Sequence, residues 1–379
     1  MSNYLKSLFL LFAAVLYSLT VSAQKVKKGG VTYQIKDGYA IIYEVDKNAS
    51  EITIEGYVTY KNQQYKVSEV WFVGRVSGYS ISRLNCPNLR RVTFSKTCTE
   101  IVSSVLFNSS VETVIILGRV EKIGDNAFYK SDLKNIVIPN SVKEIGKFAF
   151  ASSNLKEIVI PNSVKGIGPY AFDGCPNLES VILPSYLESL EKGIFEKCSF
   201  LKEIVIPSSI KSIGEVAFYK SGLKDIVIPN SVKAIGKFAF ASSNLKEIVI
   251  PNSVKDIGPY AFDGCPNLES VILPLYLESL ENGIFEKCSS LKEIVIPSSI
   301  KSIGEVAFYK SGLKDIVIPN SVKAIGKFAF ASSNLKEIII PNNVRVIEKS
   351  AFDGCYNLES VILPNSLESI EYGLFKNCI

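Results

Sequence analysis

The sequence predicts a repeat solenoid: a right-handed, β-rich coil with a continuous parallel sheet along one side and an N-terminal β-hairpin cap. Three observations predict this fold class. Related segments return every 22 or 23 residues, each opens with a short alternating apolar run that usually ends at a proline, and residues 24–66 lie outside the period. A period of this length is typical of stacked repeats in which each unit contacts only its neighbours.

The period assigns residues 67–379 to about 14 units. In chain order the units open at Val67, Leu89, Val111, Leu133, Leu155, Leu178, Leu201, Leu223, Leu245, Leu268, Leu291, Leu313, Leu335 and Leu358. Four units make a longer period of 90 residues, with copies at 131–220 and 221–310 and an incomplete third copy after them. Residues 221–248 and 311–338 are identical, which indicates an internal duplication.

Composition argues against several functional classes. Hydrophobic residues make up 47% of the chain, as expected for an array that buries most of its apolar side chains. The net charge is +5 with the two signs interleaved, so the clustered basic surface that nucleic-acid binding needs is not expected. Histidine, the commonest general base and metal ligand, is absent. We therefore expect neither an enzyme nor a bound cofactor.

Residues 1–23 have the pattern of a secretory signal peptide. Lys6 supplies the positive charge, Leu8 to Leu19 form the apolar stretch, and Val21-Ser22-Ala23 is a cleavage site with small residues at its ends. An uncleaved anchor is the alternative, but the apolar stretch is short for a membrane span. We expect a mature chain from Gln24 that is secreted or at the cell surface and does not span the membrane.

Residues 24–66 are predicted to form the cap. Alternating β-branched and aromatic residues flank turn residues at Asp37-Gly38 and Lys61-Asn62, as in β-hairpins. A terminal unit of this kind covers the exposed end of the core. The aromatic residues here also allow a second hypothesis, a sugar-stacking platform in a glycan-binding module, formed by Tyr33, Tyr39, Tyr43, Tyr57, Tyr60, Tyr65 and Trp71.

Each repeat is read position by position from the unit that opens at Leu245. Leu245, Ile248 and Ile250 are expected to face the core, while Val249 faces outward, because side chains alternate along a strand. A proline ends the strand because it has no N–H for the ladder. A phenylalanine then recurs at one place, which predicts a stacked aromatic ladder: Phe128, Phe150, Phe172, Phe195, Phe218, Phe240, Phe262, Phe285, Phe308, Phe330, Phe352 and Phe375.

The consensus L-x-x-I-x-I-P-x-S-V-x-x-I-G-x-x-A-F-x-x-C-x-N resembles the BspA-type leucine-rich repeat of bacterial and protozoan surface proteins. The resemblance covers residues 67–379 and implies a leucine-rich-repeat solenoid that is secreted or at the cell surface. It further implies binding to extracellular or surface proteins, adhesion, and no family-wide catalytic residues. The array runs to Ile379 without a polar terminal unit, which leaves the mode of attachment open and allows end-to-end self-association.

Seven of the eight cysteines share one repeat position, and Cys98 differs. An even number of cysteines in an exported chain is compatible with disulfides, and neighbours such as Cys175 and Cys198 lie one unit apart. Their parallel Cβ vectors suit a bridge poorly, so a row of buried thiols is the favoured interpretation. No close C-x-x-C pair supports a zinc site.

The outward face of the sheet is the candidate binding site. An aliphatic residue at the fifth position of each unit and a mostly acidic residue at the third recur along the array beside a row of lysines. A solvated, salt-bridged strand face is the alternative, but an exposed apolar stripe with a charged rim often marks a protein-binding surface. The candidate residues are Lys156, Glu157, Val159, Glu203, Val205, Asp225, Val227, Lys246, Glu247, Val249, Glu293, Val295, Asp315 and Val317.

Overall fold

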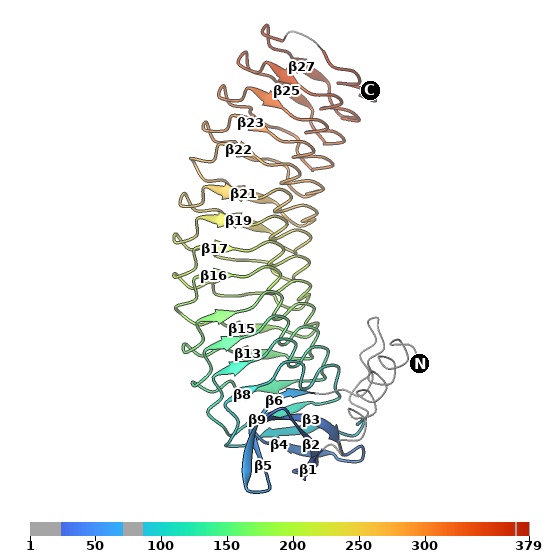
Figure 1. Ribbon diagram of the computed structural model, residues 1–379. Helices are drawn as coiled ribbons and strands as arrows, with labels where there is room; N and C mark the ends of the chain where they lie inside the picture. The colour runs from blue at the N-terminus through green and yellow to red at the C-terminus, as the bar shows by residue number, and fades with distance from the viewer. Residues whose placement is uncertain (1–23, 71–85, 368–369, 379) are drawn as a thin grey trace, which may run out of the picture.

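The computed structural model describes residues 24–70, 86–367 and 370–378. The predicted signal peptide and Trp71 therefore lie outside the described residues. The described chain forms a curved column of stacked coils with a small β-structure at its N-terminal end (Figure 1). No helix occurs in these ranges. The predicted solenoid is confirmed.

The cap is a five-stranded sheet in the order β1-β2-β3-β6-β5. Its strands are β1 (Lys25–Lys28), β2 (Val31–Lys36), β3 (Tyr39–Val45), β5 (Tyr57–Tyr60) and β6 (Gln63–Val70). Antiparallel pairing joins β2 to β3 and β5 to β6, and the turns at Asp37-Gly38 and Lys61-Asn62 have positive φ at all four residues. Both hairpins predicted from these turn residues are confirmed.

Two strands bear on the expected boundary between the cap and the solenoid. β6 crosses it and ends at Val70. β4 (Glu51–Ile54) lies within residues 24–66 but pairs in parallel with β7 (Arg91–Phe94) of the first described repeat. β4 is thus the first strand of the solenoid sheet, and the cap and the column share an element.

The strands of the candidate binding face form short parallel sheets. From β4 and β7 the first sheet continues through β9 (Thr113–Ile116) and β11 (Asn135–Ile136). Three two-stranded sheets follow: β13 (Glu157–Val159) with β15 (Ser180–Ile182), β19 (Glu247–Val249) with β21 (Ser270–Ile272), and β25 (Glu337–Ile339) with β27 (Ser360–Ile362). The expected parallel arrangement is present, but the ladder is divided into segments that recur with the 90-residue period.

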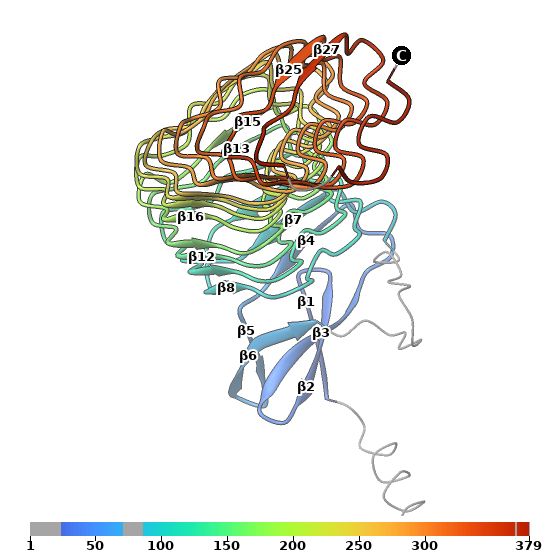
Figure 2. The same ribbon diagram turned by 90° about the horizontal axis from the view of Figure 1, so that it is seen from above.

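A second set of parallel strands follows the binding-face segment in each repeat from Leu89 to Leu335. Figure 2 shows the coils stacked along the column. Each strand has two residues, and the second is a buried isoleucine or leucine that packs over the core. They form three four-stranded sheets: β8 (Glu100–Ile101), β10 (Lys122–Ile123), β12 (Glu144–Ile145) and β14 (Gly166–Ile167); β16 (Ser189–Leu190), β17 (Ser212–Ile213), β18 (Ala234–Ile235) and β20 (Asp256–Ile257); β22 (Ser279–Leu280), β23 (Ser302–Ile303), β24 (Ala324–Ile325) and β26 (Val346–Ile347).

The phenylalanine ladder forms the third side of the core. Consecutive rings from Phe128 to Phe375 stack with centroids 5.2–5.7 Å apart and interplanar angles of 20° or less. All except Phe375 are fully buried. This offset stacking of aromatic rings adds to the stabilisation from their burial. The predicted ladder is confirmed.

The turns around each phenylalanine contain two residues in the left-handed backbone region. They lie two positions before and two positions after the ring, and their φ values run from 50° to 73° from Asn126 to Asn377. Glycine fills few of these places. Val216 has φ 50° and Val306 has φ 52°, although a β-branched residue strongly disfavours this region. The stacking of neighbouring coils therefore imposes the turn on residues that would not adopt it alone.

Candidate binding face

The aliphatic row predicted at the fifth repeat position is exposed. Its members are 55–84% accessible to solvent. They are Val137, Val159, Ile182, Val205, Val227, Val249, Ile272, Val295, Val317, Ile339 and Ile362. The residues on either side of Val159 and of Val249 are buried, as the alternation requires. A continuous apolar row of this kind is unusual on a protein surface that has no partner.

Exposure along the row follows the segmentation of the sheet. Val159 and Val249 lie in paired strands and are 58% and 56% exposed. Val205 and Val227 lie between the sheets and are 83% and 82% exposed. Around these two, the backbone N–H of Lys224 donates to the Lys202 carbonyl oxygen at 3.2 Å, and no paired strand forms. The rungs between the sheets thus present the most accessible apolar side chains of the face.

The face is hollowed into grooves that recur with the long period. The first groove is lined by Asn135, Val137, Glu157, Val159 and Ile182 among others, and has a volume of about 840 Å³. The second groove lies at the equivalent place one super-repeat later, around Asp225, Val227, Glu247, Val249, Ile272 and Leu275, with about 1070 Å³. The third groove lies around Asp315, Val317, Glu337, Ile339 and Ile362, with about 440 Å³.

A fourth groove lies between the first and the second. It has about 820 Å³ and is lined by residues that include Ile182, Glu203, Val205, Asp225 and Val227. Of the candidate residues predicted from sequence, the valines and carboxylates from Glu157 to Asp225 therefore meet in connected hollows. Four other candidates, Lys156, Lys246, Glu293 and Val295, are exposed but line none of these four grooves.

The acidic row behaves differently from the salt-bridged face that was the alternative expectation. No ion pair joins these carboxylates to a lysine or arginine within the described part of the chain: Glu157, Glu203, Asp225, Glu247, Glu293, Asp315 and Glu337. Elsewhere on the column carboxylates do pair, as Glu215 does with Lys192 at 2.8 Å and Glu278 with Lys301 at 2.8 Å. Lys156 pairs with Glu179 at 3.8 Å instead of with the acidic row.

The cysteines are free thiols, and all except the half-buried Cys378 lie in the core. Along the array their repeat position reads two serines and then two cysteines, from Ser131 and Ser153 to Cys355 and Cys378. Each cysteine from Cys175 onward donates its Sγ–H to the carbonyl oxygen of a ladder phenylalanine at 3.1–3.2 Å. Burial raises the pKa of Cys175 to about 11, which keeps it protonated and unreactive at neutral pH. The structure agrees with the buried-thiol interpretation.

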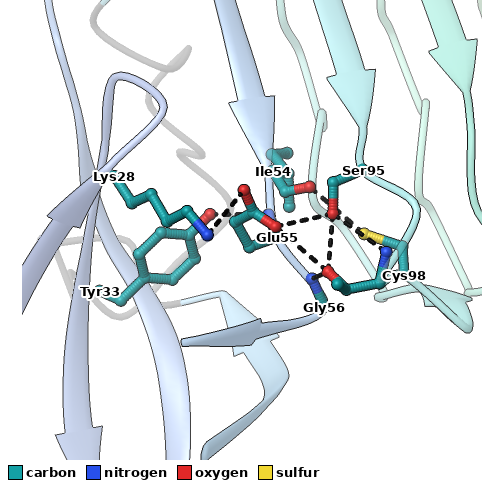
Figure 3. Close-up of polar contacts among 8 residues, drawn as sticks. Lys28, Tyr33, Ile54, Glu55, Gly56, Ser95 and Cys98 are labelled. Carbon is teal, nitrogen blue, oxygen red and sulfur yellow. Dashed lines mark hydrogen bonds and ion pairs between the residues drawn. The ribbon is translucent and has the colours of Figure 1, made fainter. Parts of the chain in front are cut away.

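Sequence reasoning missed the polar network at the junction of the cap and the first repeat (Figure 3). Glu55 Oε2 accepts hydrogen bonds from Ser95 Oγ at 2.8 Å and Thr97 Oγ1 at 3.1 Å, and Lys28 Nζ lies 3.2 Å from Oε1. The backbone N–H of Glu55 donates to the Tyr33 hydroxyl at 2.9 Å. Burial by itself would raise the pKa of Glu55, but the hydrogen bonds from Ser95, Lys28 and Thr97 and the charge of Lys28 lower it overall.

The structure removes Tyr33 from the predicted aromatic platform of the cap, and Trp71 lies outside the described residues. Tyr33 is fully buried, and its ring lies inside the cap against the network. In β5, Tyr57 and Tyr60 point to opposite faces of the strand because they lie three positions apart and side chains alternate along a strand. Tyr43 lies under Lys25 Nζ, 3.9 Å from the ring centroid. These tyrosines therefore do not form one stacking surface.

Comparison with known proteins identifies the repeat family and solved structures of the same fold. The family model described as "BspA type Leucine rich repeat region (6 copies)" matches residues 82–179, 143–269 and 255–379. The chain is similar to the crystal structure of a leucine-rich repeat protein from Bacteroides ovatus, with 30% identity over 93% of this chain and 92% of that one, and a TM-score of 0.78. No match is found among curated proteins.

Two further solved structures share the fold at lower identity. The pneumococcal vaccine antigen PcpA is 18% identical over 90% of this chain and 99% of its own, with a TM-score of 0.55. A leucine-rich repeat protein from Eubacterium ventriosum is 22% identical over 93% of each chain, with a TM-score of 0.54. Each of these two likenesses covers at least 90% of this chain, so the shared fold includes nearly its whole length.

Proposed function

The chain belongs to the BspA-type leucine-rich repeat family, and from this premise we propose that it is a secreted or cell-surface protein that binds extracellular proteins and mediates adhesion. The partner meets the exposed face of the repeats, and the protein acts by binding and not by catalysis. The observation that carries the proposal is the aliphatic row, from Val137 to Ile362, which lies exposed over the hollowed face. Such a stripe is typical of a protein-binding surface.

The repetition of the face supports a broad contact area. Equivalent grooves recur along the column, and no pair of carboxylates stands apart as an acid and a base. The pattern of residues 1–23 supports export. In the part of the chain that the structure describes, no helix is long and apolar enough to cross a membrane.

The test is a triple substitution, Val205→Asp, Val249→Asp and Val295→Asp. The three side chains are more than half exposed, so the fold tolerates the change, while charges on the row oppose apolar contact. We expect the purified variant to lose at least about 1.4 kcal/mol of binding free energy, a tenfold change, toward the partner captured from extracellular-matrix or neighbouring-cell extracts.

Val346→Asp is the matched control, because Val346 is 50% exposed on β26, away from the row. Circular dichroism checks that each variant is folded. Equal binding by the wild type and a folded triple variant would move the interface to another surface.

A further inference from the structure

The grooves on the face are selectively acidic. Each of the four contains at least one carboxylate: Glu157 in the first, Asp225 and Glu247 in the second, and equivalent residues in the others. None of the described lysines or arginines lines any of the four. Lys224 and Lys246 directly precede the second groove's carboxylates but lie outside its lining, since neighbouring strand residues point in different directions.

The carboxylates in the grooves are available for a partner. Asp225 and Glu247 are exposed and make no ion pair, whereas Glu215 and Glu278 on other surfaces do. None of the described lysines or arginines therefore makes an ion pair with these two groove carboxylates. A cationic group placed in the groove would gain a favourable interaction without breaking an existing pair.

The floor of each groove is apolar. In the second groove Val227, Val249 and Ile272 lie on three successive rungs, and Leu275 extends the apolar surface at the edge. The third groove has the same acidic pair, as Asp315 and Glu337, one super-repeat later. Four rungs separate the two grooves, which is roughly 20 Å at the spacing of neighbouring strands.

We propose that the second and third grooves bind extended polypeptide segments in which apolar residues alternate with lysine or arginine. The apolar side chains cover the aliphatic row, and the cationic side chains pair with Asp225 and Glu247, or with Asp315 and Glu337. This inference rests on the proposed function and specifies the chemistry of the partner. Charge complementarity carries it: the grooves combine an apolar floor with unpaired carboxylates and no basic lining residue.

The test uses three synthetic peptides of about ten residues, long enough to cross several rungs. One alternates valine with lysine, one alternates valine with glutamate, and one alternates serine with lysine. Isothermal titration of the mature chain is expected to show binding of the valine–lysine peptide, weakened by added salt because exposed charges are screened. The other two peptides are expected to bind at least about tenfold more weakly, since each lacks one half of the complementarity.

The decisive variant is Asp225→Asn, Glu247→Gln, Asp315→Asn and Glu337→Gln in one chain. We expect it to bind the valine–lysine peptide at least about tenfold more weakly than the wild type. The control removes four exposed carboxylates elsewhere and has the same net charge: Glu144→Gln, Glu188→Gln, Asp256→Asn and Glu278→Gln. Equal loss in both variants, or tight binding of the valine–glutamate peptide, overturns the inference.

The inference and the proposed function fail separately. If the natural partner is lost with the three valine-to-aspartate substitutions but retained by the variant without groove carboxylates, the face binds protein and the acidic grooves do not select it. If the natural partner binds both variants as it binds the wild type, the interface lies on another surface, and the proposed binding face fails whatever the peptides do.

Discussion

Asp173 and Asp263 occupy one repeat position in consecutive super-repeats, and each lies against a glutamate of the next rung. Among the described residues, Oδ1 of each is buried without a hydrogen-bond partner, and Lys287 Nζ lies 4.0 Å from Asp263 Oδ1. Burial, followed by repulsion from Glu196, raises the pKa of Asp173 to about 6, although Lys197 opposes the shift. Burial and Glu286 raise the pKa of Asp263 in the same direction. At the residue scale, the stacking of the coils thus buries two carboxylates where their ionised forms are unfavourable.

The first prediction concerns how the raised pKa values of these two aspartates affect stability. A folded-state pKa above the unfolded value means that the folded chain binds more protons, so stability rises as pH falls from 7.5 through about 6. Asp173→Asn with Asp263→Asn removes the ionisable groups. We expect a higher melting temperature at pH 7.5, by roughly 2–4 °C for each kcal/mol gained, and a flatter profile between pH 7.5 and 5. Thermal unfolding by circular dichroism measures both.

Asp353 supplies the matched control for that prediction. It occupies the same position in the third copy, but the residue in the place of Glu196 is Lys376, and Asn377 Nδ2 donates to Asp353 Oδ1 at 2.9 Å. Asp353→Asn removes no repulsion between carboxylates, so we expect no increase in melting temperature. A double variant that is no more stable than the wild type at pH 7.5 would contradict the assignment of the strain to these carboxylates.

At the scale of elements, β4 joins the cap to the column, because it lies within the cap segment and pairs with a strand of the first described repeat. Its pairing with β7 places Glu55 and Gly56 beside the turn that follows β7, and Thr97 Oγ1 accepts the Gly56 N–H at 3.0 Å. Cys98 Sγ–H donates to the Ile54 carbonyl oxygen at 3.3 Å in the same turn. Backbone pairing and side-chain hydrogen bonds together fix the cap on the end of the core, where it excludes water from the first rung.

The second prediction is that Glu55→Ala destabilises this junction by about 1–3 kcal/mol, because Ser95 and Thr97 lose a buried acceptor. Hydrogen exchange of β2 and β4 and urea unfolding measure the loss. Since the pKa of Glu55 is lowered in the folded chain, its contribution is present above its ordinary pKa and is lost as pH falls through the lowered value. The difference in the free energy of unfolding between Glu55→Ala and the wild type should therefore become smaller at acid pH.

Glu51→Ala is the control for the junction. Glu51 lies on the same strand, β4, but its side chain is exposed. We expect it to change stability by no more than about 0.5 kcal/mol. If Glu55→Ala were equally mild, the network would be dispensable and the β4–β7 pairing alone would hold the cap.

At the scale of the whole molecule, stability comes from stacking. Each coil contacts only its neighbours, so the column behaves as a series of interfaces and not as one globular core. The 90-residue period repeats these interfaces nearly unchanged, including the order of serines and cysteines and the division of the sheet. Because residues 221–248 and 311–338 are identical, the chain contains the same interface twice.

The third prediction follows from this repetition. Deletion of residues 221–310 joins Lys220 to Ser311, which has the same sequence context as the native Lys220–Ser221 junction. We expect a folded, shorter column. The deletion removes 90 of 379 residues, so the urea m-value should fall by about a quarter. Small-angle scattering reports the shortening.

A deletion of residues 221–299 is the control for the third prediction. It breaks the period within a repeat, so apolar and outward positions no longer align across the new interface. We expect it to be unstable or aggregated. Similar folding by both deletions would show that register is unimportant for stacking.

The sequence by itself determined the features that depend on local periodicity. Burial of Leu245 and Ile248, exposure of Val249, the Phe262 ladder position and the protonated Cys265 all follow from residue type and spacing within one unit. Alternation along a strand and the cost of exposing apolar surface act within a single repeat, so one period suffices to place them.

Only the tertiary structure decided how the units sit on one another. Stacking determines where the sheet is divided and where the groove around Val227 and Asp225 lies. It also gives Val216 a left-handed backbone and places the Tyr33 hydroxyl within hydrogen-bond distance of the Glu55 N–H. None of these is encoded in the spacing of one repeat. Rung separation and side-chain direction result from packing summed over neighbouring coils, where burial of apolar surface outweighs local backbone preference and charge pairing.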